Sequence, residues 1–226
     1  MTDAARLLVA LQHGDSFFPS GAIAFSSGLE NLADAGAVAG AADLADFVRG
    51  QVEHRWAPFD RPVVAAAHRA AHDPDALAAL DGAVEARSLA AAPREGSRRA
   101  GRALLSVHAR MGVVAATDYQ ARVVRGAAHG HLPVVQGLVW AAVGLGEAEA
   151  LALSAHACVT GLTGAALRLG LVGHVDAQAI RRDLAPAIER ALAADLPPVE
   201  GLHAFTPLAE IAVMRHETAE TRLFMT

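Results

Sequence analysis

The stretch 147-EAEALALSAHACVTGLTGAALRLGL-171 is the most apolar part of this 226-residue chain and decides its fold class. No charged residue occurs between Ala150 and Leu167, so the segment is nearly long enough to cross a membrane. A spanning helix needs strong Leu, Ile, Phe and Val content, whereas this one is interrupted by small and polar residues. The interruptions are Ser154, His156, Thr160, Gly161, Thr163 and Gly164. We therefore predict a helix buried in a protein core and no association with membranes.

Helical signals continue outward from this segment in both directions. Of all residues, 53% are hydrophobic, 54 are alanine and only 4% are aromatic, which favours closely packed helices over strands. No alternating strand pattern and no fixed-period repeat occurs. The sequence thus predicts an all-α, single-domain helical bundle of roughly eight to ten helices. The expected helices cover residues 6–13, 22–35, 43–56, 59–72, 76–91, 92–111, 118–128, 132–143, 147–171 and 176–194.

Prolines mark two predicted boundaries. Ala57-Pro58 is expected to stop the helix over residues 43–56, since proline lacks a backbone N–H and clashes with the preceding helical turn. Pro197-Pro198 is expected to end the bundle, which gives a bundle domain over residues 1–195 and a C-terminal tail over 196–226. We expect this tail to be flexible, to lie outside the bundle and to bind a partner.

Composition excludes several functional classes. All nineteen basic residues are arginine, so the chain has no lysine for a nucleotide-binding P-loop, a Schiff base or a pyridoxal phosphate site. A single cysteine, Cys158, rules out an internal disulfide and predicts a small buried core residue. A net charge of −5 and a pI near 6.1 argue against nucleic-acid binding. No signal peptide is recognisable, so we expect a cytoplasmic protein.

Histidine pairs support the main alternative function. His68 and His72 are four residues apart on one predicted helical face, and His129 and His131 flank a glycine. A helical metal carrier or metal-dependent enzyme could use these four side chains. The simpler interpretation is a solvated helix face for the first pair and a turn with exposed rings for the second. A zinc-protease motif beginning at His216 fails because its second ligand position holds glutamate.

A basic stripe is predicted on the helix over residues 92–111. Arg94, Arg98 and Arg102 are four residues apart and would share one face. The stripe is either a solvated surface or a docking face for an acidic protein, where opposite charge speeds encounter.

Three separated segments carry the clearest functional signal. The first is 19-PSGAIAFSSGLE-30, in which Gly28 lies inside a predicted helix and suggests close approach of another backbone. The second is 168-RLGLVGHVDAQ-178, and the third is 204-AFTPLAEIAVMRHE-217 with the terminal Arg222-Leu223-Phe224. Together with Arg94-Glu95, the run 101-GRALL-105, His131, Pro133 and Gly137, these segments resemble the UreF family of urease accessory proteins in order and spacing.

This resemblance implies an all-helical scaffold, commonly a homodimer, that is not an enzyme. Such a scaffold joins the accessory protein UreD, also called UreH, and the GTPase UreG on urease apoprotein, and thereby helps to load nickel into urease. It implies no cofactor and no metal site of its own. The corresponding partner-binding residues are Phe25, Ser26, Gly28, Glu30, Arg168, Gln178, His216, Glu217, Arg222, Leu223 and Phe224.

Overall fold

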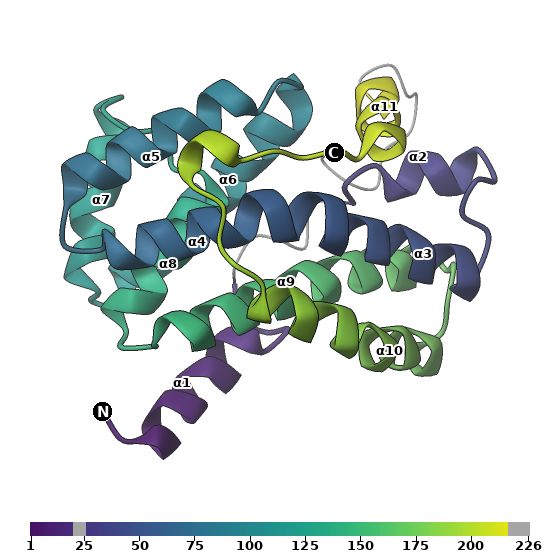
Figure 1. Ribbon diagram of the computed structural model, residues 1–226, viewed down its shortest axis with the longest axis horizontal. Coiled ribbons are helices and arrows are strands. Elements are labelled where there is room, and N and C mark those ends of the chain that lie inside the picture. The colour runs from purple at the N-terminus through teal and green to yellow at the C-terminus, as the bar shows by residue number, and fades with distance from the viewer. Residues whose placement is uncertain (20–25, 217–226) are drawn as a thin grey trace.

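The computed structural model describes residues 1–19 and 26–216, with side chains up to Met214. In these residues every regular element is helical, so the all-α prediction is confirmed. Figure 1 shows the helices packed into one bundle. In chain order they are α1 (Asp3–Gly14), α2 (Leu29–Asp34), α3 (Ala41–Gln51), the π-helix η2 (Val52–Asp60), α4 (Arg61–Arg69), α5 (Pro74–Arg87), α6 (Ala91–Arg110), α7 (Val114–Val124), α8 (Leu132–Ala142), α9 (Glu147–Arg168), α10 (His174–Ala193), the 3-10 helix η3 (Val199–Gly201) and α11 (Pro207–His216).

Helix α9 is the buried helix that the sequence predicted, and it joins two hydrophobic cores. Its N-terminal half contributes Leu151 and Leu153 to a core shared with α4 to α8. Its C-terminal half contributes Val159 and Leu162 to a second core shared with α2, α3, η2 and α10. Although α9 is long and apolar enough to cross a membrane, more than half of its most apolar window is buried inside the bundle.

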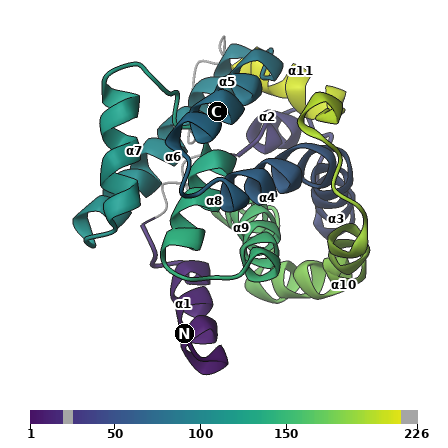
Figure 2. The same cartoon turned by 60° about the vertical axis from the view of Figure 1, so that its left-hand side comes forward.

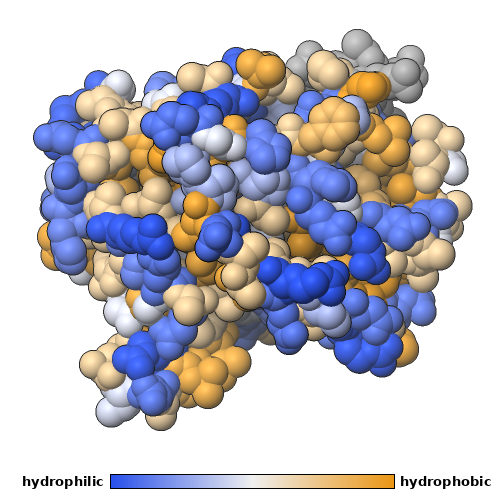
Figure 3. All heavy atoms as spheres, viewed as in Figure 1, coloured by the Kyte–Doolittle hydropathy of each residue, from blue (hydrophilic) through white to orange (hydrophobic). Residues whose placement is uncertain are grey.

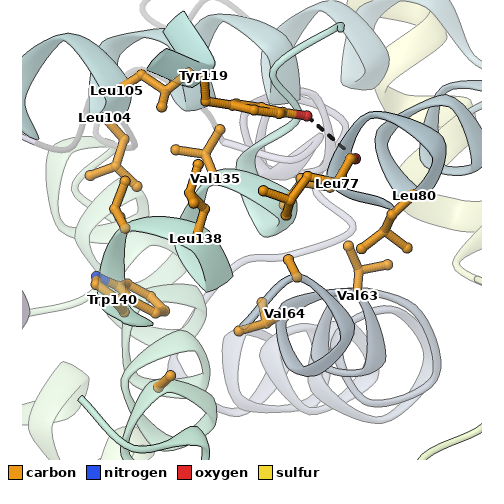
Figure 4. Packing of buried hydrophobic residues seen from close by; sticks show 14 of the residues in the cluster. Val63, Val64, Leu77, Leu80, Leu104, Leu105, Tyr119, Val135, Leu138 and Trp140 are labelled. Atoms are coloured by element: carbon orange, nitrogen blue, oxygen red, sulfur yellow. Dashed lines mark hydrogen bonds between the residues drawn. The ribbon is translucent and has the colours of Figure 1, made fainter. Parts of the chain in front are cut away.

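Close packing of α8 on α4 organises the first core. Figure 4 shows Val135 and Leu138 of α8 between Val64 of α4 and Tyr119 of α7. Gly137 makes this approach possible, because a Cβ atom there would lie 2.4 Å from the carbonyl oxygen of Val64. Small residues at such crossings let two helix backbones approach closely, as the alanine-rich composition suggested.

The predicted helix stop at Pro58 is wrong. The chain continues without interruption from α3 through η2 into α4, with Pro58 inside the π-helix. A π-helix forms hydrogen bonds between residues five apart, and the backbone N–H of Arg61 accordingly donates to the carbonyl of Trp56. This wider turn accommodates a proline that an α-helix would exclude.

The N-terminal boundary of α2 also differs from the prediction. The expected helix over 22–35 begins only at Leu29, after a turn in which Ser27 and Gly28 both have positive φ angles, 52° and 85°. Residues 20–25 lie outside the part of the chain that the structure describes.

Most of the predicted tail packs on the bundle, contrary to the expectation that it lies outside. Leu202 is buried in the first core, and the backbone N–H of Phe205 donates to the carbonyl of His54 at 2.9 Å. Helix α11 then packs beside α2, as both ribbon views show (Figures 1 and 2). The reason is that Ala209, Ala212 and Val213 form a small apolar face, which is buried. Residues 217–226 lie outside the described residues.

Candidate partner-docking site

Helices α2 and α11 bring the first and third sequence segments together. A Cβ atom on Gly28 would lie 2.7 Å from the carbonyl oxygen of Ala209 and 3.2 Å from side-chain atoms of Ala212 and Val213. The close backbone approach that Gly28 suggested is therefore confirmed, and its partner is α11. Its φ of 85° adds a second requirement for glycine, since other residues rarely adopt this conformation.

Polar contacts fix the same pair of helices. The Asn31 side-chain amide of α2 donates to the carbonyl oxygen of Ala212 in α11 at 2.7 Å. Ser26 and Glu30 are both buried beside this contact, so neither presents its side chain on the surface. Ser27, which precedes Gly28, is the one residue other than glycine at positive φ in the described part of the chain, and such strain is concentrated at functional sites. Gly28 and Asn31 thus position α11 on the bundle.

The outer face of α11 is apolar and exposed. Phe205 just before the helix is 71% exposed, and Leu208, Ile211 and Met214 along the helix are 61%, 44% and 50% exposed. Its inner face is also apolar, through Ala209, Ala212 and Val213. A helix that is hydrophobic on both sides is normally enclosed by protein. The outer side of α11 therefore has the composition of a protein contact surface.

A cavity of about 240 Å³ lies beneath α11, between η2, α6, α8 and α9. The π-helix lines it with Arg55 and Asp60, which form an ion pair at 3.2 Å and are five residues apart, the spacing of one π-turn. Cys158 of α9 lies opposite, and burial together with the nearby Asp60 carboxylate raises the pKa of its thiol to about 12. Ala209 and Val213 of α11 line this space, whereas Ala212 packs in the second core, so the position of α11 depends on α2 and on that core.

The second sequence segment begins at the C-terminal end of α9. Arg168 is the last residue of α9 and is exposed, and Gln178 is exposed in the first turns of α10. Desolvation lowers the pKa of the Arg168 guanidinium. Leu171 and Val172 of this segment pack against the second core, which also contains Leu29 and Leu32 of α2.

Several predicted partner-binding residues are not placed. Phe25, Glu217, Arg222, Leu223 and Phe224 lie outside the described residues. His216 is the last residue of α11, and its side chain is likewise beyond the described part of the structure.

His68 and His131, one from each predicted histidine pair, form hydrogen bonds within the bundle. His68 Nε2 contacts the Leu145 carbonyl oxygen at 2.8 Å, whereas His72 is exposed. His131 is fully buried between Glu85 and the hydroxyl of Ser97, at 2.8 Å and 3.1 Å, so the expected exposed ring is wrong. The Glu85 carboxylate and the Ser97 hydroxyl satisfy both ring nitrogens of His131, which allows the ring to be buried. Nowhere in the described residues do three His, Cys, Asp or Glu side chains gather as a metal site would require.

One acidic side chain, Glu85, contacts both the buried His131 and the basic stripe. Glu85 of α5 binds Arg94 and Arg98 of α6, so two of the three stripe arginines are largely neutralised and only Arg102 is exposed. Although burial opposes it, hydrogen bonds from Arg98 and His131 hold the pKa of the Glu85 carboxyl below its usual value. The structure therefore favours a structural role for most of the stripe.

Comparison with known proteins agrees with this picture. A sequence model of the UreF family matches residues 38–185. The chain is 31% identical over 234 residues to the urease accessory protein UreF of Trichodesmium erythraeum, covering 99% of this chain and 98% of that protein. It is also 31% identical over 227 residues to the proteins of the same name from Yersinia pseudotuberculosis and Yersinia enterocolitica, covering 98% of this chain and 99% of theirs. The chain belongs to the UreF family, whose members are non-catalytic urease accessory proteins.

Proposed function

We propose that this protein is a non-enzymatic scaffold for urease maturation, which bridges UreD/UreH and the GTPase UreG on urease apoprotein so that nickel can be inserted. The relatives' shared name supports the link to urease, and the residues themselves support a scaffold. The chain has no lysine for nucleotide chemistry, and its cysteine thiol has a raised pKa. In this proposal the scaffold acts in the cytoplasm as a homodimer.

The single observation that supports this function best is the exposed apolar face of α11. Phe205, Leu208, Ile211 and Met214 together form a surface rich in the residue types that dominate protein contacts. Helix α2 holds this face in place through Gly28 and Asn31. We assign this surface to UreD/UreH, because a large apolar contact suits a stable partner better than a cycling GTPase.

A charge placed on this face tests the assignment. Leu208→Asp puts a carboxylate at the second residue of α11, where the helix dipole favours it and the fold is unaffected. Val114→Asp is the matched control, since Val114 is 72% exposed and opens α7 on another part of the bundle. We expect Leu208→Asp to lose co-purification with UreD/UreH and Val114→Asp to retain it. Equal binding by both variants would refute the assignment.

The terminal residues are tested separately. A chain that ends after His216 keeps Leu202 and α11 in place, whereas a cut near residue 200 would remove part of the core. If Arg222-Leu223-Phe224 are docking residues, the chain ending at His216 remains folded by circular dichroism but binds its partners more weakly. Unchanged affinity would assign partner binding to the bundle and α11 alone.

A further inference from the structure

Helix α1 is docked on the bundle by a few polar contacts and by two partly buried apolar residues, Val9 and Ala10. It protrudes at one end with the N-terminus at its tip (Figures 1 and 2), and none of its residues is buried. Leu7, Leu8 and Leu11 are exposed, and Figure 3 shows orange apolar residues on this protrusion. Arg6 forms an ion pair with Glu149 of α9 at 3.1 Å. Because little apolar surface is buried, single polar contacts weigh heavily in the docking of α1.

The contact between His13 of α1 and His108 of α6 is the most unusual of these. Their Nε2 atoms are 3.0 Å apart. The ring centroids are 5.1 Å apart and the planes differ by only 22°, so the two facing nitrogens point nearly at each other. This is the geometry of an N–H···N hydrogen bond, in which one nitrogen donates and the other accepts.

The other ring nitrogens determine how many protons the pair holds. His13 Nδ1 lies 2.8 Å from the carbonyl oxygen of Val9, and His108 Nδ1 lies 2.9 Å from that of Leu104. A carbonyl oxygen only accepts, so both Nδ1 atoms carry hydrogen. One further hydrogen is needed between the Nε2 atoms, since two facing lone pairs would repel. Three hydrogens on two imidazoles give the pair one positive charge.

The surroundings of the pair limit it to that single charge. Phe18 packs against both rings, with centroids 4.6 Å from His13 and 5.6 Å from His108; His108 is fully buried, and His13 is partly buried. The nearest charged groups lie at the rim. Asp15 and Arg110 line the adjoining surface pocket. On α9, Glu149 is paired with Arg6, and His156 contacts the Gly14 carbonyl and lies beside Arg181 of α10. No neighbouring carboxylate contacts either ring in the described residues.

We propose that His13 and His108 share one bridging proton, and that a second proton breaks the bridge and releases α1 from the bundle. With two protons, both Nε2 atoms would carry hydrogen and both rings would be charged at 3.0 Å, which the buried site cannot accommodate. The bridge therefore acts as a pH-sensitive latch on α1.

The direction of the pH effect follows from burial. Desolvation lowers the pKa of both imidazoles from 6.5, and the charge of His13 lowers that of His108 further. Two separated histidines hold close to two protons well below pH 6.5 and close to none well above it, while the docked pair holds one. Docking of α1 is therefore strongest near pH 6.5, and below that pH acid favours release by up to about tenfold per pH unit for one proton.

Nuclear magnetic resonance of the full-length protein labelled with ¹⁵N tests the bridge directly. We expect a ¹⁵N–¹⁵N coupling across the hydrogen bond between the two Nε2 nuclei at pH 6.5, which disappears on acidification. In the same range, hydrogen-exchange protection of α1, corrected for intrinsic rates, should fall about tenfold per pH unit while α8 stays protected. Absence of the coupling, or α1 protection independent of pH, would overturn the proposal.

Variants separate the latch from general destabilisation. His108→Gln should flatten the acid dependence, because an amide can donate to a neutral ring or accept from a charged one. His13→Gln on α1 gives the same test without changing a buried residue. His156→Gln removes the other imidazole that contacts α1 and should retain the coupling. Stoichiometric nickel or zinc binding that requires both His13 and His108 would instead identify a metal site and overturn the proton bridge.

Discussion

Replacing Gly28 with alanine should loosen α11 specifically, and Gly36 provides a matched control. Both glycines have positive φ angles, 85° and 68°, so alanine at either costs about 1–2 kcal/mol in backbone strain. The two sites differ in their neighbours. A Cβ atom at Gly36 meets nothing within 4 Å, whereas one at Gly28 lies 2.7 Å from the carbonyl oxygen of Ala209.

The extra cost at Gly28 can be worked out from what α11 must give up to relieve this contact. Moving α11 away breaks the hydrogen bond from Asn31 to Ala212, worth about 1 kcal/mol. It also exposes part of Val213, whose full burial contributes about 1.5–3 kcal/mol. We therefore expect Gly28→Ala to lower the free energy of unfolding by about 3–6 kcal/mol, against about 1–2 kcal/mol for Gly36→Ala.

Urea unfolding followed by circular dichroism measures both variants, and hydrogen exchange shows where protection is lost. In Gly28→Ala the amides of residues 209–214 should lose protection before those of α8, and binding to UreD/UreH should weaken with them. Equal destabilisation of the two variants, or retained hydrogen-exchange protection of α11 in Gly28→Ala, would refute the argument that Gly28 fixes the position of this helix.

Three further predictions concern the core. Asp81→Asn should lower the free energy of unfolding by about 2–4 kcal/mol. The fully buried Asp81 carboxylate accepts hydrogen bonds from the Tyr119 hydroxyl and from three backbone amides of residues 129–131, whereas an asparagine amide has only one acceptor oxygen. Urea unfolding at pH 7 measures this loss, and a loss of less than about 1 kcal/mol would count against the prediction. Gly137→Ala should destabilise the protein by about 3 kcal/mol, because the added Cβ atom overlaps the backbone of Val64. In contrast, Gly82→Ala in α5 should stabilise the protein by up to about 1 kcal/mol, because its Cβ atom meets nothing within 4 Å. Similar midpoints of thermal unfolding for the two variants would contradict the close crossing of α8 and α4. The Cys158 thiol, with a pKa of about 12, should react with iodoacetamide at pH 8 about a thousandfold more slowly than a free thiol. Unfolding in urea should restore the normal rate. Rapid labelling of the native protein would show that the cavity beneath α11 is open to solvent.

Local sequence signals predicted much of the fold. The apolar, uncharged run of α9 predicted a buried helix, and the surrounding helical patterns predicted an all-α bundle, since both depend on residues close together in the chain. Gly28 correctly predicted close approach of another backbone, but the premise that it lies inside a helix was wrong, because α2 begins at Leu29 and Gly28 precedes it with positive φ. The same reasoning failed at Pro58, where a π-helix replaced the expected break.

The sequence by itself thus determined the class of fold, the buried helix and the need for a close contact at Gly28, because helix periodicity and backbone preference are properties of neighbouring residues. Only the tertiary structure decided that α11 supplies that contact, that His131 is buried against Glu85, and that His13 faces His108. These partners are separated by tens of residues or more, and their pairing depends on how the helices cross. No local pattern encodes that crossing, because it arises from the packing of both cores together.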